Sequence, residues 1–184
     1  MLQILIVLSL LLTFYLIMIM PNFLRRKEMK PFLQRDYAHR GLHSADKLIP
    51  ENSMAAFREA LNNNLAIELD IHLTRDNQIV VFHDETLDRI CHVPGTIENS
   101  SYEELRSLRL QGTSEHIPLF SDVLNYVNGR VPLLIELKLP STDTRLCNYT
   151  LKLLRTYNGP VLIQSFNSLG VRWFFKNAPD ILRG

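Results

Sequence analysis

The stretch from residue 67 to residue 84, IELDIHLTRDNQIVVFHD, constrains the fold of this chain more than any other part of its sequence. Apolar and polar side chains alternate in its first half, and its second half contains the apolar run IVVF, which predicts two strands joined by a polar turn. Because side chains repeat every two residues along a strand, three polar ones are expected on one face: Glu68, Asp70 and His72. Carboxylates that share a face repel each other, so a buried site that keeps both ionised usually contains a cation. A solvated strand face is the simpler alternative.

Residues 1–24 contain no charged side chain and consist mostly of Ile, Leu, Val, Met and Phe. Twenty helical residues span about 30 Å, the thickness of a bilayer core, so we expect a single transmembrane helix that anchors the chain. No basic region precedes this run and no small-residue cleavage site follows it, which disfavours a cleaved signal peptide. A hydrophobic helix buried in a larger assembly is the alternative.

A basic linker follows over residues 25–33, and residues 34–184 form the remaining domain. The linker contains four basic residues and one acid; the basic residues are Arg25, Arg26, Lys27 and Lys30. Because positive flanks stay on the cytoplasmic side of a membrane, the domain is expected to face the cytosol.

The composition excludes one class of partner. The 20 Lys and Arg residues nearly balance the 19 Asp and Glu residues, and no basic stripe is interleaved with aromatic side chains. Nucleic acid is therefore not an expected partner. The two cysteines, Cys91 and Cys147, lie far apart without the spacing of a metal site, which indicates a reducing compartment and no disulfide framework.

Predicted strands alternate with predicted helices from residue 34 onward. The strands are expected at 34–38, 65–73, 79–82, 131–137, 161–165 and 180–182. Three of the helices have recognisable N-termini: Asn52 or Ser53 caps the first, Ser101 forms a capping box with Glu104, and Ser121 caps a third. Such alternation is typical of a parallel α/β sheet or a (β/α) barrel.

Polar side chains that could carry chemistry lie at or near the C-terminal ends of the predicted strands, where such barrels place their active sites. They are His39, Arg40, Glu68, Asp70, His83, Asp84, Glu136 and Lys138. Three carboxylates suit a hard divalent cation such as Mg²⁺ or Ca²⁺, and two histidines can exchange protons near neutral pH. Arginine and lysine suit an anionic group such as a phosphate. A structural role for each residue alone, and a zinc site built from the two histidines, are the alternatives.

Eight short motifs together resemble the glycerophosphodiester phosphodiesterase (GDPD) family. They are HRG at 39–41, PENS at 50–53, AF at 56–57, IELD at 67–70, LTRD at 73–76, VFHD at 81–84, LDR at 87–89 and IELK at 135–138. Their order and spacing are highly specific, and the resemblance runs from about residue 35 to the last residue. It implies a TIM (β/α)₈ barrel hydrolase that cleaves small-molecule glycerophosphodiesters to glycerol 3-phosphate and an alcohol, in lipid metabolism.

The resemblance also implies a role for each matched residue. Glu68, Asp70 and Glu136 would hold the divalent metal, Mg²⁺ or Ca²⁺. His39 and His83 would be the catalytic acid/base pair, and Arg40 and Lys138 would bind the substrate phosphate. The nucleophile would be water or the glycerol 2-hydroxyl group of the substrate, and the motifs do not distinguish the acid from the base.

The chain departs from the family pattern in three places. Asn52-Ser53 stands for the usual Asn-Thr, and Arg89-Ile90-Cys91 stands for the usual Arg-Thr-Thr. Only about six strands are predicted where the barrel has eight, so we expect a C-terminally truncated barrel that lacks two βα units.

Two further readings of the function are open. A lysophospholipase D-like or sphingomyelinase D-like phosphodiesterase on a related barrel is one, since the expected anchor would hold the domain near a lipid surface. An inactive fragment, or a binding module for phosphodiester head groups, belongs to a different class.

Overall fold

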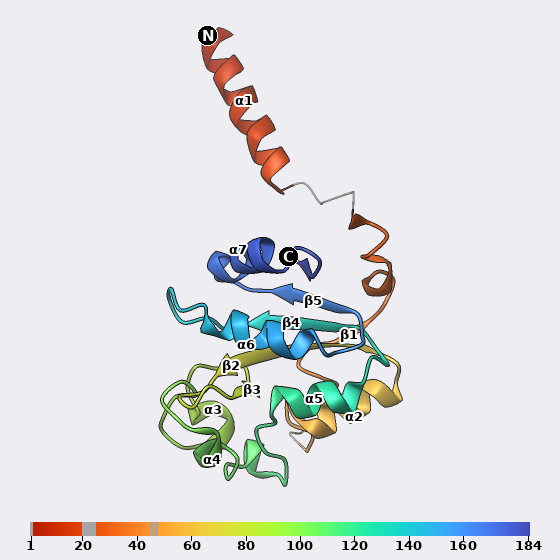
Figure 1. The fold of residues 1–184 in the computed structure, drawn as a ribbon, viewed down its shortest axis with the longest axis vertical. Helices are drawn as coiled ribbons and strands as arrows, with labels where there is room; N and C mark the ends of the chain where they lie inside the picture. The colour runs from red at the N-terminus through yellow and green to blue at the C-terminus, as the bar shows by residue number, and fades with distance from the viewer. Residues whose placement is uncertain (1, 20–24, 45, 47) are drawn as a thin grey trace. The chain divides into compact units, whose positions relative to one another are not determined.

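The computed structural model describes residues 2–19, 25–44, 46 and 48–184 of the chain. They divide into two units, Met1–Lys30 and Pro31–Gly184, which are considered separately. The first unit contains helix α1 (Leu2–Ile19), whose sequence has no charged residue (Figure 1).

The predicted transmembrane anchor over residues 1–24 is not supported. Helix α1 has 18 residues, so it rises over about 27 Å, which is slightly less than the bilayer core of about 30 Å. Within the described ranges, no helix is both long enough and apolar enough to cross a membrane. Residues 1 and 20–24 of the predicted anchor lie outside the described residues.

The second unit contains a six-stranded sheet. Its main path is parallel, in the order β1 (Tyr37–Ala38), β2 (Ala66–Leu73), β4 (Leu133–Leu137), β5 (Val161–Gln164) and β6 (Leu182–Arg183). Strand β3 (Ile79–Val81) lies off this path and pairs antiparallel with β2. All six predicted strands are therefore present, and the predicted parallel α/β architecture is confirmed.

One expectation about the sheet is wrong. The strand at 79–82 was counted among the six strands of the predicted barrel, but β3 does not lie on the parallel path. Only a short turn separates it from β2, with Asn77 in a left-handed conformation (φ 61°). A parallel connection needs a dozen or more residues, so a turn of this length can join the two strands only as an antiparallel hairpin. Five strands, rather than six, follow the parallel path.

Helices alternate with most of the strands along the second unit (Figure 1). They are the α-helices α2 (Met54–Asn62), α3 (Asp88–Cys91), α4 (Tyr102–Leu105), α5 (Phe120–Val127), α6 (Arg145–Leu154) and α7 (Ser168–Asn177), with the short 3₁₀ turn η3 (Leu110–Gly112). A further 3₁₀ turn, η2 (Lys30–Phe32), contains the last residue of the first unit and the first two residues of the second.

Two of the three predicted helix caps are confirmed. The Ser53 hydroxyl accepts a hydrogen bond from the backbone N–H of Ala56, and Ser101 forms the capping box with Glu104. The cap predicted at Ser121 is wrong: helix α5 begins at Phe120, so the N-cap position is Leu119, two residues earlier, and it has no side-chain cap. Phe120 is fully buried in the core, and its packing determines where this helix starts.

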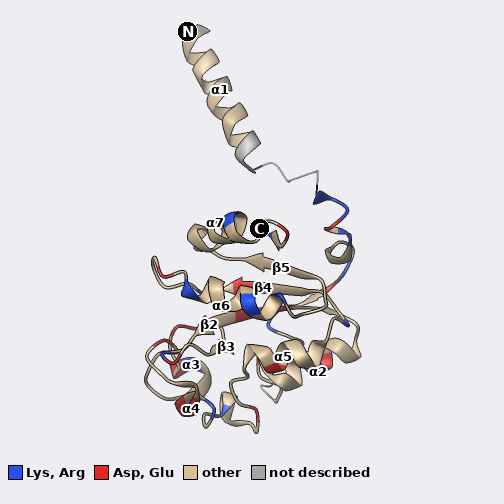
Figure 2. Ribbon diagram, in the orientation of Figure 1, with Lys and Arg blue, Asp and Glu red and all other residues tan. Residues whose placement is uncertain are grey.

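The two faces of β2 have different chemistry, although all eight of its residues are buried. Ile67, Leu69 and Ile71 belong to the main hydrophobic core, together with side chains of α2, α5, α6 and α7. The alternating polar residues lie on the other face, and the only acidic residues of the sheet lie on β2 and β4 (Figure 2). The sheet therefore has an apolar face covered by helices and a polar face that can form a site.

A second hydrophobic cluster lies outside this core. It consists of residues between Val80 and Ile117, among them Phe82, Leu87, Ile90 and Leu105. These residues come almost entirely from the connection between β3 and α5, residues 82–119, called the connecting segment below. Because the connecting segment packs around its own cluster, it can present polar side chains to the sheet without contributing to the main core.

Gly41 shapes the turn after β1. Its φ is +77°, and a Cβ atom built on it would lie 2.7 Å from the Cβ and 2.9 Å from the carbonyl carbon of Ala56. The turn thus requires glycine for two reasons, its backbone conformation and its contact with α2.

Replacing Gly41 by alanine should therefore cost more stability than the same change at Gly112, which also has a positive φ (+74°) but has open space around it. Left-handed strain alone costs about 1–2 kcal/mol, and forced overpacking adds about 1–3 kcal/mol. We expect the free energy of unfolding, measured by urea denaturation, to fall by about 2–4 kcal/mol in Gly41→Ala and by about 1–2 kcal/mol in Gly112→Ala. Equal losses in the two variants would contradict the steric argument.

Candidate active site

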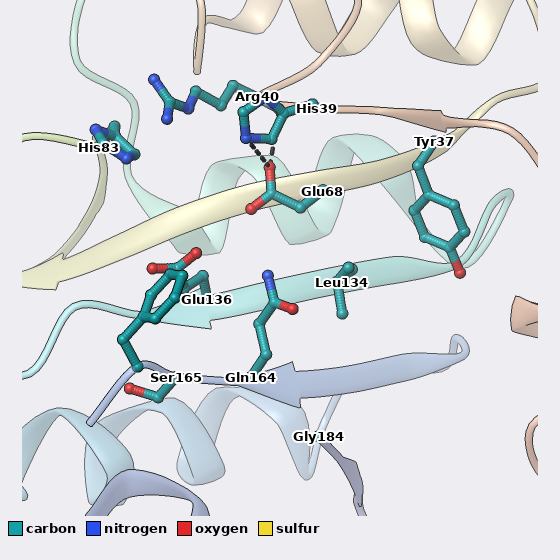
Figure 3. A pocket seen from close by; sticks show the side chains of 11 residues that line it. Tyr37, His39, Arg40, Glu68, His83, Leu134, Glu136, Gln164, Ser165 and Gly184 are labelled. Atoms are coloured by element: carbon teal, nitrogen blue, oxygen red, sulfur yellow. Dashed lines mark hydrogen bonds and ion pairs between the residues drawn. The ribbon is translucent and has the colours of Figure 1, made fainter. Parts of the chain in front are cut away.

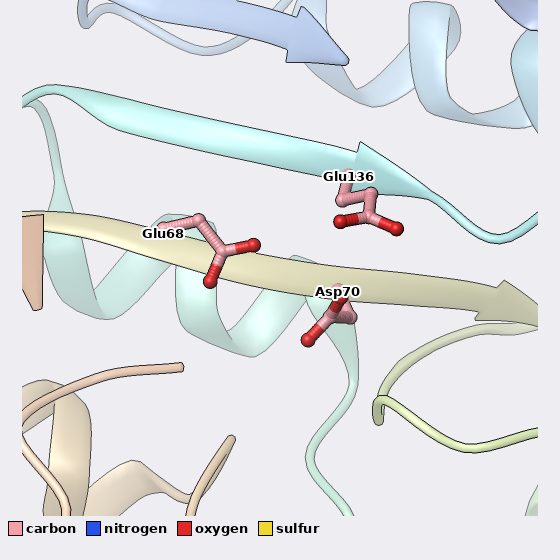
Figure 4. Close-up of side chains that lie close together, drawn as sticks. All are labelled: Glu68, Asp70 and Glu136. Atoms are coloured by element: carbon pink, nitrogen blue, oxygen red, sulfur yellow. The ribbon is translucent and has the colours of Figure 1, made fainter. Parts of the chain in front are cut away.

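The three predicted metal-binding carboxylates lie together on the polar face of the sheet (Figure 4). Glu68 and Asp70 come from β2 and Glu136 from β4, and the parallel register places Asp70 directly opposite Glu136. One carboxylate oxygen from each residue lies within 4.8 Å of the others. All three side chains are buried, with at most 7 % of any residue exposed.

Burial makes this cluster electrostatically unfavourable without a cation. Desolvation, followed by repulsion from Asp70 and Glu136, raises the pKa of Glu68 to about 7. Lys138 gives partial compensation: its Nζ lies 3.0 Å from Oδ1 of Asp70 and is also paired with Glu136. Although burial alone would lower the pKa of Lys138, its bonds to these carboxylates raise it. Three clustered carboxylate oxygens are the donors that a hard divalent cation prefers, so the residues fit such a metal.

Arg40 contacts the cluster from the turn after β1. Its backbone N–H donates to Oε2 of Glu68 at 2.9 Å, and its Nε lies 3.6 Å from Oδ2 of Asp70. The guanidinium also donates to Oε1 of Glu51 at 2.9 Å. Arg40 is therefore held between acids on two sides, which fixes its direction at the edge of the site.

Asn52 is a site residue whose role sequence reasoning missed, since it was considered only as a helix cap. Its Nδ2 donates to Oδ2 of Asp70 at 2.9 Å, and its side chain is almost fully buried. The backbone of Asn52 is in the left-handed conformation, with a φ of 53°. Its place in the PENS motif indicated that Asn52 belongs to the family pattern. No property of the residue alone distinguishes a hydrogen bond to Asp70 from a helix cap.

His39 and His83 approach the cluster from separate loops (Figure 3). Nε2 of His39 lies 3.9 Å from Oε2 of Glu68, and its side chain is about two-thirds exposed. Partial burial, and then the positive charge of Arg40, lower the pKa of His39. Both histidines line one cavity of about 670 Å³ together with Arg40, Glu68 and Glu136. Asp70 and Lys138 are not among the residues that line this cavity, but they contact those that do.

A chain of ion pairs fixes His83. Its Nδ1 lies 2.6 Å from Oδ1 of Asp84, and Arg89 donates to Asp84 through Nε at 2.6 Å and Nη2 at 2.8 Å. Arg89 also donates to both carboxylate oxygens of Glu51, the residue that binds Arg40. The sequence did not predict this connection between the histidine and arginine positions.

The hydrogen bonds from Arg89, together with His83, hold the pKa of Asp84 at about 2. A carboxyl group whose pKa is lower in the folded state stabilises the fold above its unfolded pKa of about 4, and this stabilisation is lost as pH falls toward 2.

We therefore expect Asp84→Asn to lower the free energy of unfolding by about 1 kcal/mol at pH 7, a modest value because Arg89 is half-exposed and screened. The difference between wild type and variant should shrink as pH falls from about 4 to about 2. Urea denaturation at several pH values measures it, and a difference independent of pH would contradict the role of the charge.

Comparison with known proteins places this site in a family. The model of the glycerophosphoryl diester phosphodiesterase family matches residues 39–180. A glycerophosphodiester phosphodiesterase from Caldanaerobacter subterraneus is 33% identical over 162 residues, covering 80% of this chain and 64% of that protein. A lysophospholipase D from Homo sapiens is 31% identical over 161 residues, covering 80% of this chain and 49% of that protein.

Solved structures agree. A phosphodiesterase from Oleispira antarctica, solved in complex with the product sn-glycerol-3-phosphate, is 26% identical with a TM-score of 0.74. The match covers 84% of this chain and 66% of that one. The chain spans 62–64% of the length of several curated relatives. Its motifs, its carboxylate cluster and these matches together show that the chain belongs to the glycerophosphoryl diester phosphodiesterase family.

Proposed function

We propose that this domain hydrolyses glycerophosphodiesters to glycerol 3-phosphate and an alcohol, in glycerophospholipid metabolism. The observation that carries the proposal is the cavity in which two histidines and an arginine face a buried three-carboxylate cluster. Family membership supports it, as does the product bound to the Oleispira antarctica relative.

We propose Mg²⁺ or Ca²⁺ as the metal held by Glu68, Asp70 and Glu136. Three carboxylates favour a hard cation over zinc, which prefers nitrogen and sulfur ligands, and the ring nitrogens of His39 and His83 are not part of this cluster. When bound, such an ion supplies charge neutralisation at the phosphoryl oxygens and makes a nearby hydroxyl group more acidic.

The side chains of the cavity supply the remaining chemistry. Arg40 and Lys138 add positive charge beside the phosphate, although both are also paired with acids of the site. One of the two histidines takes the proton from the nucleophile, water or the glycerol 2-hydroxyl, and the other protonates the departing alkoxide. For His83, Asp84 binds Nδ1, so Nε2 is the ring atom left for proton transfer to or from the substrate.

Each histidine can be tested alone. We expect His39→Ala and His83→Ala to lower turnover of glycerophosphocholine by roughly 10²–10⁴-fold, the usual contribution of general acid–base groups. His116→Ala is the matched control, because that histidine bonds the backbone of Leu108 in the connecting segment, away from the cavity. Unchanged rates in both site variants would rule out the acid/base assignment.

An activated aryl phosphodiester then identifies the acid. A good leaving group does not need protonation, so loss confined to poor leaving groups marks the mutated histidine as the acid. Comparable loss on both substrates marks it as the base.

The metal is tested through one of its ligands. Glu68→Gln removes one charge from the cluster, so Mg²⁺ or Ca²⁺ should bind at least tenfold more weakly, as measured by calorimetry, and excess metal should restore activity only in part. Glu103→Gln is the control, since that carboxylate is exposed on α4 and pairs with Arg106. Full activity of the wild type in chelator would remove the metal from the mechanism.

Lysophospholipase D activity is the second candidate, favoured by the human relative of that name. Comparing lysophosphatidylcholine with glycerophosphocholine as substrates discriminates the two activities, because only the former carries an acyl chain. The cytosolic location of the domain stays a prediction based on the basic residues after the apolar run, and a C-terminal reporter in cells would test it.

A further inference from the structure

His72 is a buried histidine that the proposed chemistry leaves unused. It lies on the polar face of β2, two residues beyond Asp70, and it pairs with Val80 of β3 in the antiparallel hairpin. Only 1 % of the residue is exposed. Polar side chains buried to this degree nearly always make specific hydrogen bonds, so the contacts of the ring indicate the role of the residue.

The ring of His72 binds the main chain of His83. Its Nε2 lies 3.2 Å from the backbone carbonyl oxygen of His83. Because a carbonyl oxygen can only accept, Nε2 of His72 is the donor and carries a proton. Among the described residues, no other group donates a hydrogen bond to this carbonyl. His72 therefore joins the peptide that follows His83 to the central strand of the sheet.

The second ring nitrogen of His72 shows that packing alone does not explain this residue. Nδ1 is buried and has no hydrogen-bond partner among the described residues. With the proton on Nε2, Nδ1 is an acceptor, and a buried acceptor without a partner lowers the stability of the fold. An apolar side chain of similar size would avoid this cost. The bond from Nε2 to His83 is the contact that an apolar side chain could not replace.

Two hydrogen bonds attach the segment around His83 to β2. The backbone N–H of Phe82 donates to the carbonyl oxygen of Asp70 at 3.0 Å, and the His72 bond follows one residue later. Asp84 orients the ring of His83 separately, through Nδ1. If the His72 bond were lost, the bond at Phe82 would still hold the end of the hairpin. The peptide after His83 would then be free to rotate, and the imidazole would move with it.

We propose that His72 is a positioning residue, whose Nε2–H holds the carbonyl of His83 so that the His83 ring keeps its place beside the carboxylate cluster. This inference rests on the proposed hydrolase function, in which His83 transfers a proton. Proton transfer requires the ring within hydrogen-bond reach of the reacting oxygen, and a displacement of about 1 Å can lower turnover by about 100-fold. His72 itself transfers no proton to the substrate, because the carbonyl occupies its Nε2–H.

Two amide variants test the position of the donor. The amide nitrogen of glutamine can reach the place of Nε2, whereas that of asparagine reaches only the place of Nδ1 and falls short of the carbonyl. We expect His72→Asn to lower kcat for glycerophosphocholine by roughly 10- to 100-fold with little change in KM, and His72→Gln to retain most of the rate. His72→Leu also removes the donor at similar size, and it provides the same comparison if the asparagine variant does not fold.

His116 provides the matched control, because its Nδ1 bonds the backbone carbonyl of Leu108 away from the cavity. His116→Leu removes a bond of the same kind, so it should leave kcat unchanged. Calorimetry should find the same Mg²⁺ or Ca²⁺ affinity in all His72 variants, since this ring is not part of the carboxylate cluster.

Nuclear magnetic resonance of the His83 ring in the full chain gives a readout that does not depend on activity. The ring signals should shift or broaden in His72→Asn and His72→Leu, and keep their wild-type positions in His72→Gln. If they do so although the wild-type chain hydrolyses nothing, the positioning role stands and the proposed hydrolase function fails.

Three results would overturn the inference. The first is an unchanged His83 signal and rate in the variants that lack the donor. The second is an equal loss of rate in His72→Gln and His72→Asn, which would indicate a merely structural role. The third is a rise in KM at constant kcat, which would mean that His72 contacts the substrate instead of positioning His83.

Discussion

The pairing of β2 with β4 in a single parallel register is the constraint on which the rest of the site depends. That register places Asp70 opposite Glu136 and keeps Glu68 two residues away on the same face. Such close carboxylates are held in place because the opposite face of the same strands, with Leu69 and Ile135, is buried in the main core. A slip of one residue would exchange the two faces and lose both the core and the cluster.

A network of charged side chains joins the loops that surround this cluster. Glu51 binds Arg40 and Arg89, and Arg89 binds the Asp84 carboxylate that orients His83. The turn after β1 and the connecting segment are thus coupled through one shared glutamate. Individual ion pairs at the surface contribute little to stability, but a bidentate network of this kind fixes geometry.

The strands, the parallel architecture and the position of the main site residues could be predicted from sequence, because alternation and strand-end polarity depend only on local order. To predict that β2 and β3 form an antiparallel hairpin, one has to recognise that the turn at Asn77 is too short for a parallel crossover. The roles of Asn52 and Arg89 could not be predicted, since each acts through partners distant in sequence: Asp70 for Asn52, Glu51 for Arg89. The start of α5 was misplaced because buried Phe120, not a cap, determines it.

The connecting segment has its own hydrophobic cluster, and this arrangement separates two kinds of sequence change. Substitutions in residues 82–119 that preserve Phe82, Ile90 and Leu105 can alter Glu85 and Glu98 without disturbing the sheet that carries the three carboxylates. The same segment also contributes His83, Asp84 and Arg89 to the site, so the packing of Phe82 and Ile90 beside them supports that histidine separately from the main core.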